Sequence, residues 1–318
     1  MFLLSAAPSN AEWSATTAAK MLFTDNVYEL SASRRLALSE DPSQPVRVSL
    51  DKPSDVVWQP TIDLRRASST RAGLTELSFK ADGFLYTNNP LFNHGDYRLQ
   101  VRQQASPDTW VLFRYRFVPN LLLGPNFERQ TGQFQLAKER VTEHVWRTQI
   151  ETRLSEQWGA TLVGRYGLRL YNDAFSERDT KFYSIGTSVH YKPVLWIRLT
   201  LEYLYEIGHA EGAHQMQYKD DVSYAQQFGS FISLIQLRKA FWLELTYVYR
   251  TKQFTSSIVG DPYNGTSDAL HQGTVEVHYD LSDRARLTVG YQRTQRHSSL
   301  SSREFFNDNT SVGLEYRF

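Results

Sequence analysis

Apolar and polar residues alternate along most of this chain, in stretches of roughly ten to fifteen residues that end in turns. The final stretch places large apolar side chains at every second position: Val312, Leu314, Tyr316 and Phe318. Polar residues and one glycine fill the positions between them. Because successive side chains of a strand point to opposite faces, this period predicts strands with one face in an apolar medium and the other in polar surroundings.

About fourteen stretches of this kind can be counted, and most are as long as the roughly 9–11 residues of a membrane-crossing strand. They lie at residues 22–38, 56–67, 73–85, 95–104, 109–122, 144–154, 158–171, 182–192, 195–207, 226–237, 241–254, 270–281, 286–295 and 308–318. Strands of soluble proteins are shorter, with about five or six residues. The stretch at 226–237 is the weakest, because apolar residues occupy both of its faces.

The connections between these stretches alternate between short turns and long polar loops. The short turns lie at residues 68–71, 105–108, 155–157, 193, 239–240 and 282–283. The long loops lie at residues 39–55, 86–94, 124–143, 172–181, 208–225, 255–269 and 297–307. This layout predicts an all-β chain, a transmembrane antiparallel up-and-down barrel of about fourteen strands. We expect an N-terminal segment at residues 1–19, one barrel over residues 20–318, and the loop at 124–143 as the best candidate to fold into the lumen.

The C-terminal residues carry a resemblance to a known family. Val312, Leu314, Tyr316 and the terminal Phe318 match the signal that outer-membrane barrels present to the barrel-assembly machinery. With its layout, the chain resembles the single-chain β-barrel proteins of Gram-negative outer membranes, and in size the fourteen-stranded, porin-like channels. The resemblance implies a location in the bacterial outer membrane, in contact with the lipid bilayer and lipopolysaccharide.

Composition narrows the possible functions. Aromatic residues make up 14% of the chain, although the mean hydropathy is −0.47. No stretch approaches the roughly 20 apolar residues of a membrane-spanning helix, which excludes a helical membrane protein. The net charge of +1 gives no support to a nucleic-acid partner. The count of Cys is zero, which excludes disulfides, thiolate catalysis and zinc bound by cysteine.

The first residues allow two interpretations. Phe2, Leu3 and Leu4 followed by small residues resemble the end of a secretory signal peptide, with a cleavage site after Ala11. The basic residues that normally precede such a segment are missing. The segment is therefore either a truncated signal peptide or a short apolar N-terminus.

The face opposite the apolar one is rich in charge, and we predict that it lines a wet lumen, because unpaired buried ions cost several kcal/mol each. One group, the cationic arc, comprises Arg98, Arg102, Arg114, Arg116, Arg147, Arg165, Arg169 and Lys192. A second group, the carboxylate arc, comprises Glu202, Glu206, Glu244, Glu276 and Asp280. The two arcs either face each other across the lumen and create a transverse field, or pair directly and narrow it.

Motifs for catalysis are absent from the sequence. His209 and His214 share a loop with Asp220 and Asp221, but this spacing is not specific for a metal site or a hydrolase. His278 and Asp280 share an inward face, where a hydrogen bond is the simpler interpretation. We predict no enzyme activity, no cofactor and no metal, and a channel for small polar or charged solutes. The alternative is a plugged barrel that serves a structural or export partner in an envelope or surface-polysaccharide complex.

Overall fold

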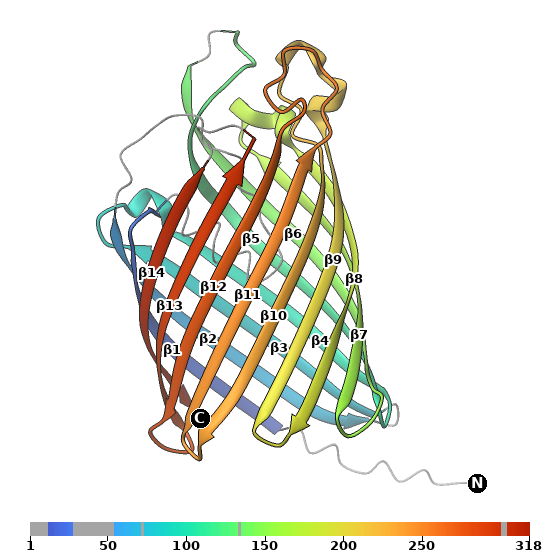
Figure 1. The fold of residues 1–318 in the computed structure, drawn as a ribbon, viewed down its shortest axis with the longest axis vertical. Coiled ribbons are helices and arrows are strands. Elements are labelled where there is room, and N and C mark those ends of the chain that lie inside the picture. Colours follow the sequence, from blue (N-terminus) through green and yellow to red (C-terminus); the bar gives the residue numbers. More distant parts are fainter. Residues whose placement is uncertain (1–11, 28–53, 71–72, 133–134, 300–303) are drawn as a thin grey trace, which may run out of the picture.

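The computed structural model describes residues 12–27, 54–70, 73–132, 135–299 and 304–318. Fourteen strands form one closed barrel (Figure 1). The strands are β1 Glu12–Thr24, β2 Asp55–Thr70, β3 Gly73–Tyr86, β4 His94–Ser106, β5 Thr109–Phe127, β6 Leu136–Arg153, β7 Trp158–Tyr171, β8 Thr180–Val194, β9 Ile197–Ala210, β10 Tyr224–Arg238, β11 Phe241–Phe254, β12 Ser267–Asp280, β13 Ala285–Ser298 and β14 Phe305–Arg317. The predicted fold class is therefore confirmed.

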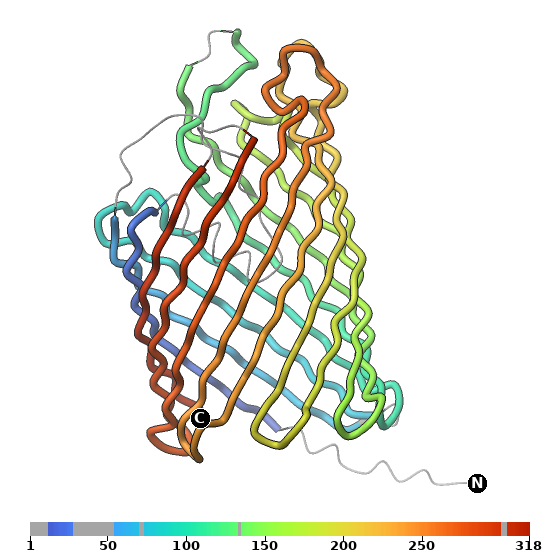
Figure 2. The backbone as a smooth tube through the Cα atoms, viewed as in Figure 1, coloured from blue at the N-terminus to red at the C-terminus, as the bar shows by residue number. Residues whose placement is uncertain are grey.

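Each strand pairs antiparallel with its neighbours in the sequence, and β1 closes the wall by pairing with β14 over Thr16–Thr24. The tube in Figure 2 follows this up-and-down path, with the C-terminus and the start of β1 at the end of the barrel that carries the short turns. A closed wall leaves no edge strand with unpaired backbone groups. In the described part of the chain, no helix is long and apolar enough to cross a membrane.

The first strand differs from its prediction. It runs from Glu12 to Thr24 instead of residues 22–38, so the wall begins before the expected boundary at residue 20. Its outward positions carry three small residues in succession, Ala15, Thr17 and Ala19, which weakens the apolar period. The suspected signal remnant and most of the stretch at 22–38 lie outside the described residues.

The loop expected at residues 124–143 is mostly strand. β5 continues to Phe127 and β6 starts at Leu136, so these two long strands form a hairpin that projects beyond the rest of the wall (Figure 1). Glu139 and Glu143, which we expected in this loop, lie on β6 with side chains excluded from solvent. The expected internal loop is therefore wrong for the described residues, and the pattern failed there because the projecting part has no apolar outer face.

The outer surface of the wall is apolar and carries two aromatic girdles. Toward the long-loop end, a row of outward-facing rings crosses five strands: Tyr97, Phe117, His144, Trp146, Tyr166 and Tyr183. Near the short turns, Trp158 stacks on Tyr191 at 4.1 Å between ring centroids. Exposed aliphatic residues such as Leu99, Leu162 and Ile185 lie between the girdles. This is the surface that a barrel presents to the hydrocarbon of a bilayer.

The long-loop end of the barrel carries a folded cap, which consists of residues 172–179, 211–223 and 255–266. Short 3-10 helices at Asp173–Arg178, Glu211–His214 and Met216–Tyr218 form part of it. A buried apolar cluster joins the cap to the tops of β9, β10 and β11: Ala210, Val222, Tyr224, Phe254 and Tyr263. The Asp261 carboxylate accepts hydrogen bonds from the backbone of Asp221 and Tyr263. The long connections here are thus ordered structure above one side of the lumen.

Candidate functional site

The predicted lumen residues all lie on inward-facing positions of the wall, because they alternate with the exposed apolar residues of their strands. β4 to β7 carry the seven arginines of the cationic arc, and β9, β11 and β12 carry the five acids of the carboxylate arc. The period of two was sufficient for this assignment. It could not predict which of these charges meet, since contacts across several strands depend on the curvature of the closed wall.

A set of buried ion pairs, the lumen charge cluster, lies below the cap and comprises Arg116, Glu143, Arg165, Arg169 and Glu206. Arg169 Nε donates to Glu143 Oε1 at 3.1 Å, and Arg165 Nη2 donates to Glu206 Oε2 at 2.8 Å. Glu143 also faces Arg116 at 3.5 Å. All five side chains are buried. The two arcs therefore meet by direct contact in this part of the lumen.

Tyr224 ties this cluster together from β10. Its hydroxyl accepts a hydrogen bond from Arg169 Nη1 at 2.5 Å and donates one to Glu206 Oε1 at 2.6 Å. The Arg169 guanidinium also stacks over the ring of Phe182, 4.3 Å from its centroid. Such shared contacts offset part of the desolvation penalty of buried charges. Among the described residues, Arg169 Nη2 makes no hydrogen bond and faces Glu206 Oε1 at 3.6 Å. The sequence analysis missed Tyr224 as a lumen residue, because it assigned residue 224 to the loop at 208–225 and β10 starts two residues earlier than predicted.

Two further acids lie among the arginines of the cationic arc, and the sequence analysis did not predict that they pair with these arginines. Asp96 on β4 accepts hydrogen bonds from Arg98 and Arg116, and Glu151 on β6 accepts from Arg102. Only part of the cationic arc reaches the carboxylate arc, as in the pair of Arg147 with Glu202 at 3.4 Å. The charges on this side of the lumen therefore also pair among themselves, because Asp96 and Glu151 lie among the arginines.

Apolar side chains also enter the barrel. One buried cluster inside the wall joins six strands: Val163 of β7, Leu204 of β9, Phe228 of β10, Val248 of β11, Leu270 of β12 and Phe305 of β14. This cluster and the lumen charge cluster fill the side of the barrel that lies under the cap. Open space remains at the short-turn end, along β1 to β5 on the opposite side of the barrel and also along β4 to β9.

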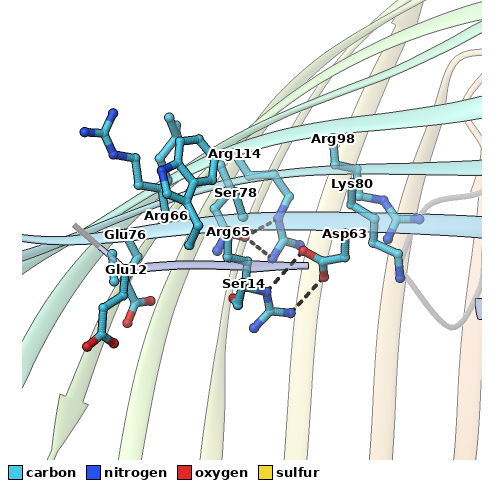
Figure 3. A pocket seen from close by; sticks show the side chains of 14 residues that line it. Glu12, Ser14, Asp63, Arg65, Arg66, Glu76, Ser78, Lys80, Arg98 and Arg114 are labelled. Atoms are coloured by element: carbon cyan, nitrogen blue, oxygen red, sulfur yellow. Dashed lines mark hydrogen bonds and ion pairs between the residues drawn. The ribbon is translucent and has the colours of Figure 1, made fainter. Parts of the chain in front are cut away.

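A cavity of about 480 Å³ opens on that opposite side, toward the short-turn end (Figure 3). Its inward-facing lining contains more cationic side chains than acids: Arg65, Lys80, Arg98 and Arg114 against Glu12, Asp63 and Glu76. Arg65 forms an ion pair with Asp63 at 2.8 Å, and Arg114 is held by the side-chain amide oxygen of Gln100 at 2.7 Å. Four cationic and three acidic side chains therefore border the cavity, and behind them Asp82 pairs with Arg98 at 3.4 Å and with Lys80 at 4.0 Å.

The cap contains an acid with an altered ionisation. Arg178 pairs with Asp220 and with Glu139, both at 2.8 Å, and the Glu177 side chain lies next to this group. Burial raises the pKa of Glu177 to about 7, and the neighbouring Asp220 carboxylate acts in the same direction. Burial also raises the pKa of Asp179. Asp220 and Asp221, suspected of catalysis in the sequence, are engaged in structural contacts with Arg178 and the Ser223 backbone.

Replacing Glu177 with glutamine is expected to stabilise the cap at pH 8 by on the order of 1 kcal/mol. The pKa in the folded chain, about 7, lies above the ordinary 4.5. Between these values the folded state keeps a proton that the unfolded state has lost, so stability falls as the pH rises through this window. Urea unfolding in detergent at pH 5 and pH 8 measures the effect, with the exposed Glu211→Gln as control. An unchanged pH dependence in Glu177→Gln would show that another group is responsible.

Comparison with solved structures finds the same barrel fold in bacterial outer-membrane proteins. It is similar to the in-vitro folded OmpT of Vibrio cholerae, with a TM-score of 0.53 and 9% identity over 99% of both chains. It is similar to the outer membrane channel DcaP of Acinetobacter baumannii, with a TM-score of 0.55 and 9% identity over 98% of this chain and 97% of the other. The anion-selective porin of Comamonas acidovorans gives a TM-score of 0.51 and 8% identity over 98% of this chain and all of the other.

No family model matches the sequence, and no curated protein matches it either. The chain therefore shares the fold of the outer-membrane barrels at identities of 9% or less for these three structures. Similarity at this level establishes the architecture, and the function has to be argued from the lumen itself.

Proposed function

We propose that this chain is a porin-like channel of the bacterial outer membrane that passes small polar or charged solutes by passive diffusion. The observation that carries the proposal is the combination of an apolar outer wall with a lumen that contains hydrated charge. An apolar exterior requires hydrocarbon around it. Water-exposed guanidinium groups inside, as in the cavity of Figure 3, offer ions and polar solutes a substitute for bulk water.

The remaining parts of the proposal follow from this arrangement. The surrounding partners are the lipid bilayer and lipopolysaccharide, and the chain performs no chemical reaction. Two of the similar structures are a channel, DcaP, and an anion-selective porin, which supports a transport role. The excess of cationic groups around the cavity favours anionic over cationic solutes.

A plugged barrel that serves an envelope complex is the second candidate. The side chains that fill the lumen below the cap favour it, because the lumen charge cluster and the apolar cluster leave only part of the cross-section for solutes. The ordered cap would then offer a rigid surface to a partner. A bacterial polysaccharide outer membrane secretin shares this fold, at a TM-score of 0.50 and 7% identity over 95% of this chain and 98% of the other.

Conductance in planar lipid bilayers distinguishes the two candidates. The purified, refolded chain is expected to give discrete current steps that scale with the salt concentration. Recordings with an unrelated refolded barrel known to be closed provide the background level. Silence of this chain under conditions in which circular dichroism shows a folded barrel would support the plugged partner and reject the channel.

The C-terminal signal gives a separate prediction. Replacing Phe318 with alanine is expected to lower the amount of assembled protein in the outer membrane several-fold, because the assembly machinery is expected to read the outward side chains Val312, Leu314, Tyr316 and Phe318. These four side chains are exposed on the outer face, and the ring of Phe318 contacts that of Tyr316 at 4.9 Å. Heat-modifiable gel migration of membrane fractions measures assembly. Phe306→Ala, an exposed ring on the same strand, is the control, and an equal loss in both variants would reject a special role for the terminus.

A further inference from the structure

Three side chains with metal-binding atoms converge on the inner face of β11 and β12. Glu244 lies directly opposite Glu276 across the two strands, and His278 is the next inward residue along β12. Their oxygen and nitrogen atoms all lie within 4.8 Å of one another. The side chains of Glu244 and His278 are 34% and 12% exposed, so water in the lumen reaches both.

A residue outside this group orients the imidazole. The Nδ1 atom of His278 lies 2.9 Å from Oγ1 of Thr288 on β13, which fixes the ring. The other nitrogen, Nε2, then faces Glu244 at 3.6 Å. Histidines that bind metals are commonly held in this way, with one nitrogen in a hydrogen bond and the other turned to the ion.

The wall beside the acids is hollowed by a glycine. Gly290 on β13 lies directly opposite Glu276. A Cβ atom at this position would lie 2.7 Å from Ser311 Oγ and 3.1 Å from the Glu276 side chain. The glycine therefore leaves the space in which the Glu276 carboxylate lies flat against the wall.

A cation from the protein already occupies part of this space. The ammonium of Lys20 on β1 reaches past β14 and β13 and donates a hydrogen bond to Glu276 Oε1 at 2.6 Å. Two directly opposed carboxylates repel each other, and Lys20 compensates one of the two charges. The two carboxylates and the ammonium of Lys20 together carry a net charge of −1.

We propose that Glu244, Glu276 and His278 form a binding site for a divalent transition-metal ion of the Zn²⁺ type inside the lumen. Two carboxylate oxygens, one imidazole nitrogen and a lumen water give the three-plus-one arrangement of open zinc sites. The imidazole favours Zn²⁺, Co²⁺ or Ni²⁺ over Mg²⁺ and Ca²⁺, which prefer oxygen ligands. Binding displaces Lys20 from Glu276, and the two charges of the ion then cancel those of Glu244 and Glu276. The proposal is independent of conduction.

Calorimetric titration of the folded chain in detergent with ZnCl₂ at pH 7 tests the site. We expect one saturable site whose affinity falls about tenfold or more in His278→Ala and in Glu244→Gln. Lys20→Met removes the competing ammonium and is expected to bind Zn²⁺ more tightly than the unaltered chain, an outcome that a merely structural role of the cluster would not produce. His190→Ala, another inward-facing histidine, is the control and should bind normally.

Two results would overturn the proposal. One is the absence of saturable Zn²⁺ binding by chains that migrate as folded barrels. The other is equal binding by the unaltered chain and His278→Ala, which would place the ion on other histidines. Because the readout is heat of binding, a chain that fails to conduct can still confirm the site, and a conducting chain can still refute it.

Discussion

Arg169→Met is expected to lower the free energy of unfolding by about 3–5 kcal/mol, the cost of leaving buried partners of a broken ion pair uncompensated. Arg169 contacts Glu143, Glu206 and the hydroxyl of Tyr224 at once. After removal of the guanidinium, Glu143 keeps Arg116 as a more distant cationic partner, at 3.5 Å. Urea unfolding of the chain in detergent, followed by tryptophan fluorescence, measures the loss.

Arg65→Met is the matched control for this experiment. Arg65 also faces the inside and pairs with an acid, Asp63, but its side chain is 67% exposed. Exposed pairs contribute about 0–1 kcal/mol, so this variant is expected to unfold close to the unaltered chain. Equal losses in the two variants would contradict the assignment of Arg169 to a buried network.

Neutralising the cavity is expected to reduce anion preference several-fold. The variant carries Arg65→Gln, Lys80→Gln and Arg114→Gln, at three positions that line the cavity. Each unit charge at about 10 Å contributes roughly 0.4 kcal/mol in water, so loss of three shifts the difference between anion and cation by about 2 kcal/mol without salt. Screening at about 0.1 M salt reduces this shift to roughly 1 kcal/mol, which corresponds to a several-fold change. The reversal potential across a bilayer with a KCl gradient measures the permeability ratio, and the effect should shrink as the salt concentration rises.

Arg66→Gln is the control for selectivity. Arg66 borders the same cavity but alternates with the inward Arg65, and its guanidinium lies over the ring of Trp13, 5.4 Å from the centroid. In Figure 3 this guanidinium points away from the other charged groups. The control variant should leave the reversal potential unchanged. An unaltered potential in the triple variant would mean that solutes do not pass through the cavity.

Much of the fold could be predicted from the sequence, because one face of each strand in a barrel wall meets hydrocarbon and the other meets water. Apolar and polar residues therefore alternate along the strand with a period of two. Residues such as Val312 and Leu314 alternate so clearly that strand, face and direction all follow. β1 was misplaced because Ala15 and Ala19 are too small to mark an outer face. The projecting part of β5 and β6 was missed because a strand outside the apolar zone loses its alternation.

The alternation along each strand predicted which charged residues face the lumen, but it did not predict which of them form ion pairs. Arg165 and Glu206 were both placed inside from their strands, yet their contact at 2.8 Å spans two strand boundaries. Such contacts between strands that are not neighbours in the wall cannot be predicted from the local sequence. Glu143 was assigned to a loop by its polar neighbours, although its parity on β6 brings it to Arg169.

The most direct test of a barrel wall with hydrocarbon outside and water inside is the labelling of single introduced cysteines, which is possible because the sequence contains no native cysteine. Single cysteines at Leu99, Gln100, Val101 and Arg102 of β4, in chains reconstituted into liposomes, would be treated with a charged maleimide that does not enter hydrocarbon. We predict that positions 100 and 102 react from the lumen, that 99 and 101 are protected by acyl chains, and that all four react after unfolding. Equal reactivity at the four positions, or protection of 100 and 102 alone, would contradict a barrel with hydrocarbon outside and water inside.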